Sequence, residues 1–179
     1  MIHFKTALLI SSIGTLAACS PATPPATMPA TAPEAATAPV TTPATNNTSS
    51  FERNILTATG DTLGTLSLKD LGEDGTEVTV TVSGIDGAGT HGMHFHETGV
   101  CEAPSFTSSG GHFNPMSMAH GKLSPDGPHA GDMMNMEVGA DGTGTLTVIN
   151  ARVSISGDHG LPALLDADGT ALIIHERGD

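Results

Sequence analysis

Alternating apolar and polar residues are the clearest pattern in residues 51–179. In TEVTVTVS, residues 76–83, Val78, Val80 and Val82 occupy every second position, with threonines between them. Successive side chains of a strand point to opposite faces, so this pattern predicts a strand with one buried face. Similar runs lie at 52–59, 64–70, 143–149 and 170–175. No segment of this region keeps a helical period, so we predict an all-β sandwich or barrel.

One long connection interrupts the alternation. Residues 98–132 contain the segments GGHFNP, MAHG and PHAGD, with little period-two pattern between them. Connections of this length inside a compact domain usually carry a function or are disordered. Histidine recurs along this one, which favours a functional loop.

The N-terminus is typical of an export signal. Residues 1–19 combine a basic start at Lys5 with an apolar run that ends in small residues before Cys19. The segment LAAC resembles the bacterial lipobox, whose cysteine is lipidated and becomes the mature N-terminus. We therefore expect a lipid on Cys19, a place in a bacterial cell envelope or periplasm, and membrane contact through that lipid only. An ordinary cleaved signal peptide is the alternative.

A linker and one domain follow. Residues 20–50 are rich in Pro, Ala and Thr and too poor in large apolar residues to bury a core, so we expect a disordered linker. Residues 51–179 are long enough for a single domain. With 6 Lys and Arg against 19 Asp and Glu, the formal net charge of the chain is −13, which argues against nucleic acid as a partner.

Two histidines share one face of a predicted strand. His94 and His96 are two residues apart, so both point to one side, while Met93 and Phe95 point to the other. Such a strand would offer an apolar face to the core and two imidazoles to a metal. His91 has the opposite parity, and we expect it to bond backbone rather than metal.

Further potential ligands lie in the long connection and near the last residues. Three imidazoles and a carboxylate form a complete tetrahedral set for structural zinc: His112, His120, His129 and Asp132. His175 could join His94 and His96, and a fourth nitrogen from His112 would suit Cu(II). The sequence alone leaves open whether His112 serves both metals.

Six motifs follow one another in order: HGMHFHETGVCEAP, SSGGHFNP, MAHG, GPHAGD, SGDHG and ALIIHE. Together they resemble the motifs of copper/zinc superoxide dismutases, with spacings that extend the likeness over almost all of residues 51–179. The resemblance implies a Greek-key β-barrel or sandwich with copper and zinc as cofactors. It implies copper held by His94, His96, His112 and His175, and zinc held by His112, His120, His129 and Asp132.

The same resemblance implies roles for three other groups. His112 would be catalytic, because it bridges the metals and can carry a proton. Asp179 would accept hydrogen bonds from a copper-ligand and a zinc-ligand histidine, and His159 would be structural. The implied reaction converts superoxide to dioxygen and hydrogen peroxide. A copper-binding or copper-buffering envelope protein with little catalysis is the alternative.

The sequence also departs from the family pattern. It stops at HERGD, so the family's final strand, with the arginine that guides superoxide and the cysteine that bonds the one at Cys101, has no counterpart in it. We therefore expect Cys101 to lack its partner and the barrel to keep an unpaired edge. A truncated version of a full-length enzyme and a degenerate relative both fit, and the sequence leaves open a monomer or a homodimer.

Overall fold

The structure is a computed structural model that describes residues 18–21, 49–121 and 124–179. Residues 1–17 and 22–48, where most of the predicted signal peptide and linker fall, lie outside the described residues. No helix among the described residues is both long and apolar enough to cross a membrane.

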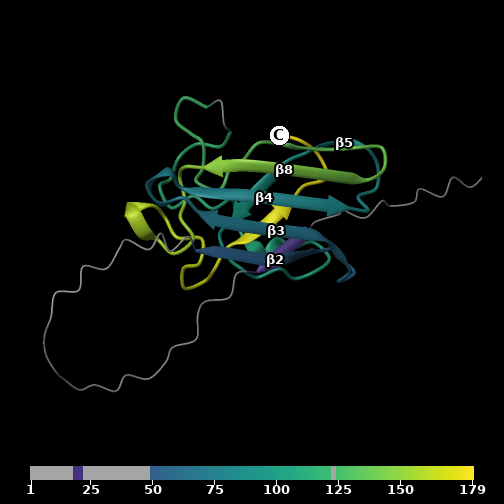
Figure 1. Ribbon diagram of the computed structural model, residues 1–179, viewed down its shortest axis with the longest axis horizontal. Coiled ribbons are helices and arrows are strands. Elements are labelled where there is room, and N and C mark those ends of the chain that lie inside the picture. Colours follow the sequence, from purple (N-terminus) through teal and green to yellow (C-terminus); the bar gives the residue numbers. More distant parts are fainter. Residues whose placement is uncertain (1–17, 22–48, 122–123) are drawn as a thin grey trace, which may run out of the picture.

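Four long antiparallel strands form one layer of the fold. Figure 1 shows them side by side, in this order: β2 (Ser50–Leu56), β3 (Thr62–Asp70), β4 (Thr76–Ser83) and β8 (Thr143–Asn150). In β4 the even-numbered side chains Val78, Val80 and Val82 are buried, as the alternation predicts. They pack with Leu66 and Leu68 of β3 in the main core. The four predicted strands here are confirmed, with ends that differ from the prediction by at most three residues.

Shorter strands form the opposite side of the sandwich. Strand β9 passes behind the layer of long strands (Figure 1). It pairs with β6 in antiparallel register, His94 opposite Ile173 and His96 opposite Ala171. Two further strands form a separate pair. The bounds are β5 (Gly89–His91), β6 (Met93–His96), β7 (Met136–Val138) and β9 (Ala171–Ile174). The sequence predicts β6 and β9 but misses β5 and β7, which are too short to show a period.

A strand from the N-terminal region completes the larger sheet. β1 (Ala18–Pro21) lies between β9 and β2, with Cys19 opposite Ile173 on one side and opposite Leu56 on the other. The expected unpaired edge is therefore wrong for β2 and β9, because both pair with β1. Ser20 and Pro21, which the sequence assigns to the linker, belong to this strand.

In its described residues the long connection forms a short turn of helix, η2 (Thr107–Ser109), and isolated β-bridges at His112 and Asp132. Two similar turns, η1 (Gly72–Asp74) and η3 (Asp158–Gly160), lie against each other. His159 in η3 is exposed and belongs to neither cluster of potential metal ligands found among the described residues. This placement agrees with its structural assignment.

Cys101 is part of a disulfide bond, and no described cysteine is free. The expectation that Cys101 lacks a partner is therefore wrong. The chain contains two cysteines, so Cys19, whose backbone lies in β1, is the only other cysteine of the sequence. Cys101 packs against a small second core of Phe106, Ala171 and Ile173. The long connection is thus attached next to β9, whose last residue precedes His175.

Candidate metal centre

Strand β6 presents two imidazoles at the centre of the site. His94 and His96 lie on the same side of the strand, while Met93 and Phe95 enter the main core on the other. All four side chains are buried, and His94 is only 1% exposed. The apolar face therefore fixes the strand, and the strand fixes both rings.

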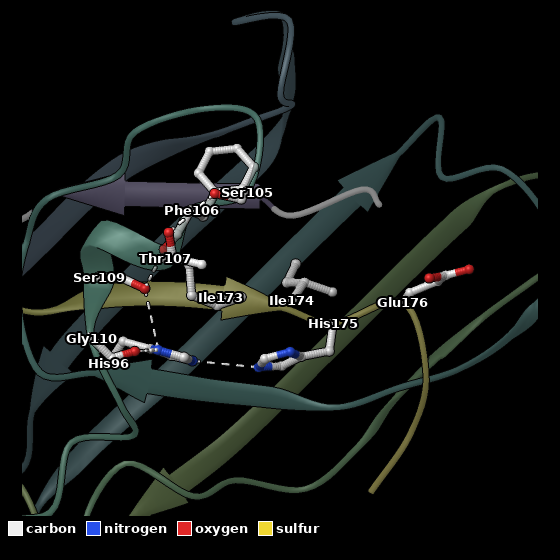
Figure 2. Close-up of a pocket in the computed structure, with 10 residues that line it drawn as sticks. All are labelled: His96, Ser105, Phe106, Thr107, Ser109, Gly110, Ile173, Ile174, His175 and Glu176. Atoms are coloured by element: carbon white, nitrogen blue, oxygen red, sulfur yellow. Dashed lines mark hydrogen bonds between the residues drawn. The ribbon is translucent and has the colours of Figure 1, made fainter. Parts of the chain in front are cut away.

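Three distant segments converge on these rings. His175 follows directly after β9, and its Nε2 lies 3.4 Å from Nε2 of His96. Figure 2 shows the two rings facing each other across the floor of a pocket. His112 comes from the long connection and is held by an isolated β-bridge between its backbone and that of His96. One potential ligand atom from each of four histidines lies within 4.8 Å of the other three: His94, His96, His112 and His175. This is the predicted copper set.

A second cluster surrounds the carboxylate of Asp132, which is 1% exposed. Its oxygens lie 3.0 Å from Nδ1 of His112, 3.2 Å from Nδ1 of His120 and 3.3 Å from Nδ1 of His129. Ligands about 2.0–2.1 Å from a tetrahedral zinc are roughly 3.3 Å apart, so this spacing suits one ion. The predicted zinc set is therefore brought together. His129 approaches Asp132 but is not among the mutually close ligand atoms, because the second group within 4.8 Å contains His94, His112, His120 and Asp132.

Two ring nitrogens indicate that the site is built for metal. Nδ1 of His94 and Nδ1 of His129 are buried and have no hydrogen-bond partner. A buried polar atom without a partner costs free energy, so such atoms are rare in folded proteins. A metal ion would satisfy each of them, since neutral imidazole nitrogen is a common ligand of both copper and zinc.

His112 belongs to both clusters. Its Nδ1 faces Asp132, which leaves Nε2 for the first group, and its ring stacks on that of His94 with centroids 3.9 Å apart. Sharing of His112, which the spacing alone left open, thus agrees with the geometry.

Asp179 connects the two clusters from outside. Nε2 of His94 donates a hydrogen bond to its Oδ2 at 2.7 Å, and Nε2 of His120 lies 3.9 Å from the same oxygen. A carboxylate in this place fixes the tautomer of His94 and turns its Nδ1 toward the metal position. The hydrogen bond to His94 matches the role that the family resemblance implies.

The environment favours the neutral form of three histidines of the first group, His94, His96 and His175. Burial lowers the pKa of His94, although its hydrogen bond to Asp179 acts in the opposite direction. Burial also lowers the pKa of His96, and with the neighbouring histidines it lowers that of His175 to about 4. For Asp132 burial alone would raise the pKa, but hydrogen bonds from Gly121 and His112 bring it below its usual value. Neutral imidazoles and an ionised carboxylate are the protonation states that metals require.

His91 is not part of either cluster. Its Nδ1 donates a hydrogen bond of 2.8 Å to the backbone carbonyl of His175. The prediction that it bonds backbone is therefore confirmed. The bond also fixes the main chain of the residue that carries a copper-set ligand.

Backbone groups near His96 could not be found from sequence. Nδ1 of His96 donates to the carbonyl of Gly110 at 2.9 Å, and the hydroxyl of Ser109 lies 3.3 Å from the same nitrogen. Figure 2 shows these contacts beside the pocket. A carbonyl carries no side-chain signature, so only the fold reveals that it orients this ring and directs Nε2 toward His175.

A pocket of about 410 Å³ opens beside His96 and His175. Its rim carries hydroxyls of Ser105 and Thr107 (Figure 2). Among the described residues that line it, Glu176 is the only one with a formal charge, and none is Lys or Arg. The approach to the first group therefore combines apolar side chains with a few hydroxyls, and its described residues include no lysine or arginine.

Comparison with known proteins agrees with this geometry. A family model described as copper/zinc superoxide dismutase (SODC) matches residues 62–179. The chain is 35% identical over 134 residues to the superoxide dismutase-like protein YojM of Bacillus subtilis, covering 74% of this chain and 68% of that protein. It is 42% identical over 92 residues to a Cu-Zn superoxide dismutase of Caulobacter vibrioides, covering 51% of this chain and 53% of that protein.

Solved structures show the same fold. The crystal structure of a SOD-like protein from Bacillus subtilis superposes with a TM-score of 0.66 at 34% identity, covering 72% of this chain and 84% of that one. A Cu/Zn superoxide dismutase from Brucella abortus gives a TM-score of 0.51 at 22% identity, a likeness of fold. Copper and zinc, the predicted cofactors, are the metals of this family, and the two histidine clusters could hold them. The chain therefore belongs to the copper/zinc superoxide dismutase family.

Proposed function

We propose that this chain dismutes superoxide with one copper and one zinc. The observation that carries the proposal is the pair of adjoining ligand clusters that share His112. Bound copper would supply the one-electron oxidation of one superoxide and the reduction of another. In balance, two superoxide anions and two protons give one dioxygen and one hydrogen peroxide.

The residues of the chain would hold the two metals and orient the ligand atoms around them. His94, His96 and His175 present neutral nitrogens to the copper position. His112 spans both positions, so Nε2 is the atom that would release and regain a proton on the copper side as the charge there changes. The carboxylate of Asp132 and the rings around it would close the zinc position, which makes zinc structural.

The test compares the metal-loaded protein with its His112→Ala variant. We expect the protein with both metals to consume superoxide well above the buffer rate. The rate of the variant should be at least tenfold lower than that of the unmodified protein. Protein loaded with zinc alone is the control for copper dependence. Full occupancy of both sites without a rate above buffer would contradict the proposal.

A second candidate is a copper-binding protein with little turnover. The pocket beside the copper set favours it, because Glu176 is the only formally charged residue among the described residues that line it, and a negative charge repels an anionic substrate. This candidate predicts tight copper binding without dismutation, and copper retention in His112→Ala. The loading experiment above separates the two.

We also propose that the protein is exported to a bacterial cell envelope. The signal-like residues 1–19 support export, and the disulfide at Cys101 suits an oxidising compartment. We propose a lipid on Cys19 only for a form of the protein without a disulfide inside the chain, because Cys19 is the only cysteine besides Cys101. A sulfur in a disulfide cannot also carry a thioether lipid, so a lipidated form would require Cys19 to be outside any disulfide. Mass spectrometry of the Cys19 peptide from native membranes, with and without reduction, distinguishes the two forms.

A further inference from the structure

The turn that carries two zinc-set ligands is held by side chains from another part of the chain. Residues 129–132, HAGD, are here called the ligand turn. It bends tightly, because the amide of Asp132 donates to the carbonyl of His129 at 3.2 Å. The amide of His129 in turn donates to the carboxylate of Asp132 at 3.1 Å.

Every carbonyl of the ligand turn accepts a hydrogen bond from outside it. The carbonyl of Gly131 receives the amide of Phe95 in β6 at 3.0 Å. The other three carbonyls receive side chains from the end of β8 and the residues after it. Asn150 Nδ2 donates to Ala130 at 2.8 Å, Arg152 Nε donates to His129 at 3.2 Å, and Arg152 Nη2 donates to Asp132 at 2.6 Å.

The two side chains act as a unit. Asn150 is 2% exposed, and its Oδ1 accepts the amide of Arg152 at 3.1 Å. The guanidinium is planar and presents its donors in a fixed fork. Because this fork donates to the carbonyls of both His129 and Asp132, it sets the distance between the backbones of two zinc-set ligands.

We propose that Arg152, supported by Asn150, is a positioning residue that holds His129 and Asp132 in the geometry that zinc requires. This inference rests on the proposed zinc site. It assigns to Arg152 a role that its charge alone would oppose, since a cation near Asp132 repels a divalent ion. If the geometric role dominates, removing the side chain should weaken zinc binding. If the charge dominates, removing it should strengthen zinc binding.

Zinc affinity of Arg152→Met tests the proposal. Loss of groups that orient metal ligands typically weakens binding 10–100-fold. We expect the dissociation constant for zinc, measured by chelator competition, to rise in that range, while copper affinity at the other cluster changes less than threefold. Arg152→Lys keeps the charge without the planar fork, so it should also bind zinc more weakly. Cobalt(II) bound in place of zinc should show an altered visible spectrum in both variants.

Arg53→Met is the matched control. Arg53 lies on β2, donates to the carbonyl of Glu52 and covers the ring of Phe51, so its loss removes the same charge away from the ligand turn. Its zinc affinity should equal that of the unmodified chain.

Three results would overturn the inference: unchanged zinc affinity in Arg152→Met, tighter zinc binding there, or equal loss of both metals with a lower melting temperature of the metal-free protein. The last would show a general structural role. If Arg152→Met does not fold, the zinc affinity of Arg152→Lys tests the inference in its place. If the unmodified chain itself binds no zinc, the proposed metal site fails, and this outcome is distinct from the failure of Arg152 as a positioning residue.

Discussion

Burial lowers the pKa of three copper-set histidines, His94, His96 and His175. The lowered pKa values of His94, His96 and His175 mean that the folded, metal-free protein keeps these rings neutral at pH values where the unfolded chain protonates them. The unfolded state then binds more protons, so stability must rise with pH across this range. The same neutrality readies the nitrogens for metal.

For His175 the window is defined, because its pKa falls from 6.5 to about 4. The contribution of His175 to the free energy of unfolding is complete above about pH 6.5 and is lost as the pH falls toward 4. It amounts to at most roughly 3 kcal/mol. We expect urea unfolding of the chelator-treated protein to show stability falling between pH 7 and pH 4.

His175→Gln should flatten that pH dependence, because it removes the titrating ring. His159→Gln, at an exposed position in η3, should leave the slope unchanged. Parallel curves for the unmodified chain and His175→Gln would contradict the assignment.

At the scale of elements, β6 has two functions on opposite faces. Its two histidines line the copper set while Phe95, 1% exposed, packs in the core. The backbone of Phe95 also joins two parts of the site, because its amide donates to Gly131 and its carbonyl accepts from Phe113. A change in core packing here is therefore expected to reach the metal ligands.

Phe95→Ala should lower the free energy of unfolding by about 3–5 kcal/mol, the usual cost of removing a buried ring. Phe95→Leu should cost less, because most of the volume is kept. Val100→Ala is the control: that side chain is 48% exposed, so we expect a change within about 0.5 kcal/mol. Chemical denaturation of the metal-free proteins gives all three values, and a cost for Phe95→Ala below that of Phe95→Leu would refute the packing argument.

For the whole molecule, the continuity of the large sheet depends on segments far apart in sequence. β1 joins β2 to β9, and the disulfide at Cys101 attaches the long connection beside β9. Edges that would otherwise be open to association are thereby paired.

Cys101→Ser should therefore destabilise the domain by about 2–5 kcal/mol, as loss of a native disulfide does in small exported domains. Urea unfolding under non-reducing conditions measures the difference. A reductant should lower the stability of the unmodified chain to that of the variant and leave Cys101→Ser unchanged. Equal stability of the two proteins without reductant would show that the bond contributes nothing.

Local patterns in the sequence were sufficient to predict much of the fold and of the metal site. The alternation in residues 76–83 predicts β4 at its observed bounds, because burial of one face of a strand follows period two directly. The parity of His94 and His96 predicts their shared side for the same reason. The identity of the potential ligands also follows from residue type, since imidazole suits both copper and zinc and a carboxylate can complete a zinc site.

Contacts between distant segments could not be predicted from these patterns. Nothing in the spacing places β1 between β9 and β2, and the sequence led to the wrong expectation for Cys101. The short strands β5 and β7 and the Arg152 contacts with the ligand turn likewise depend on which segments meet. The sequence by itself determined most of the strands, the ligand types and the family, whereas the tertiary structure decided the convergence on His112, the pairing of the sheet edges and the support of the ligand turn. The physical reason is that periodicity and side-chain chemistry are local properties, while hydrogen bonds to backbone carbonyls and strand pairing depend on chain segments brought together only by folding.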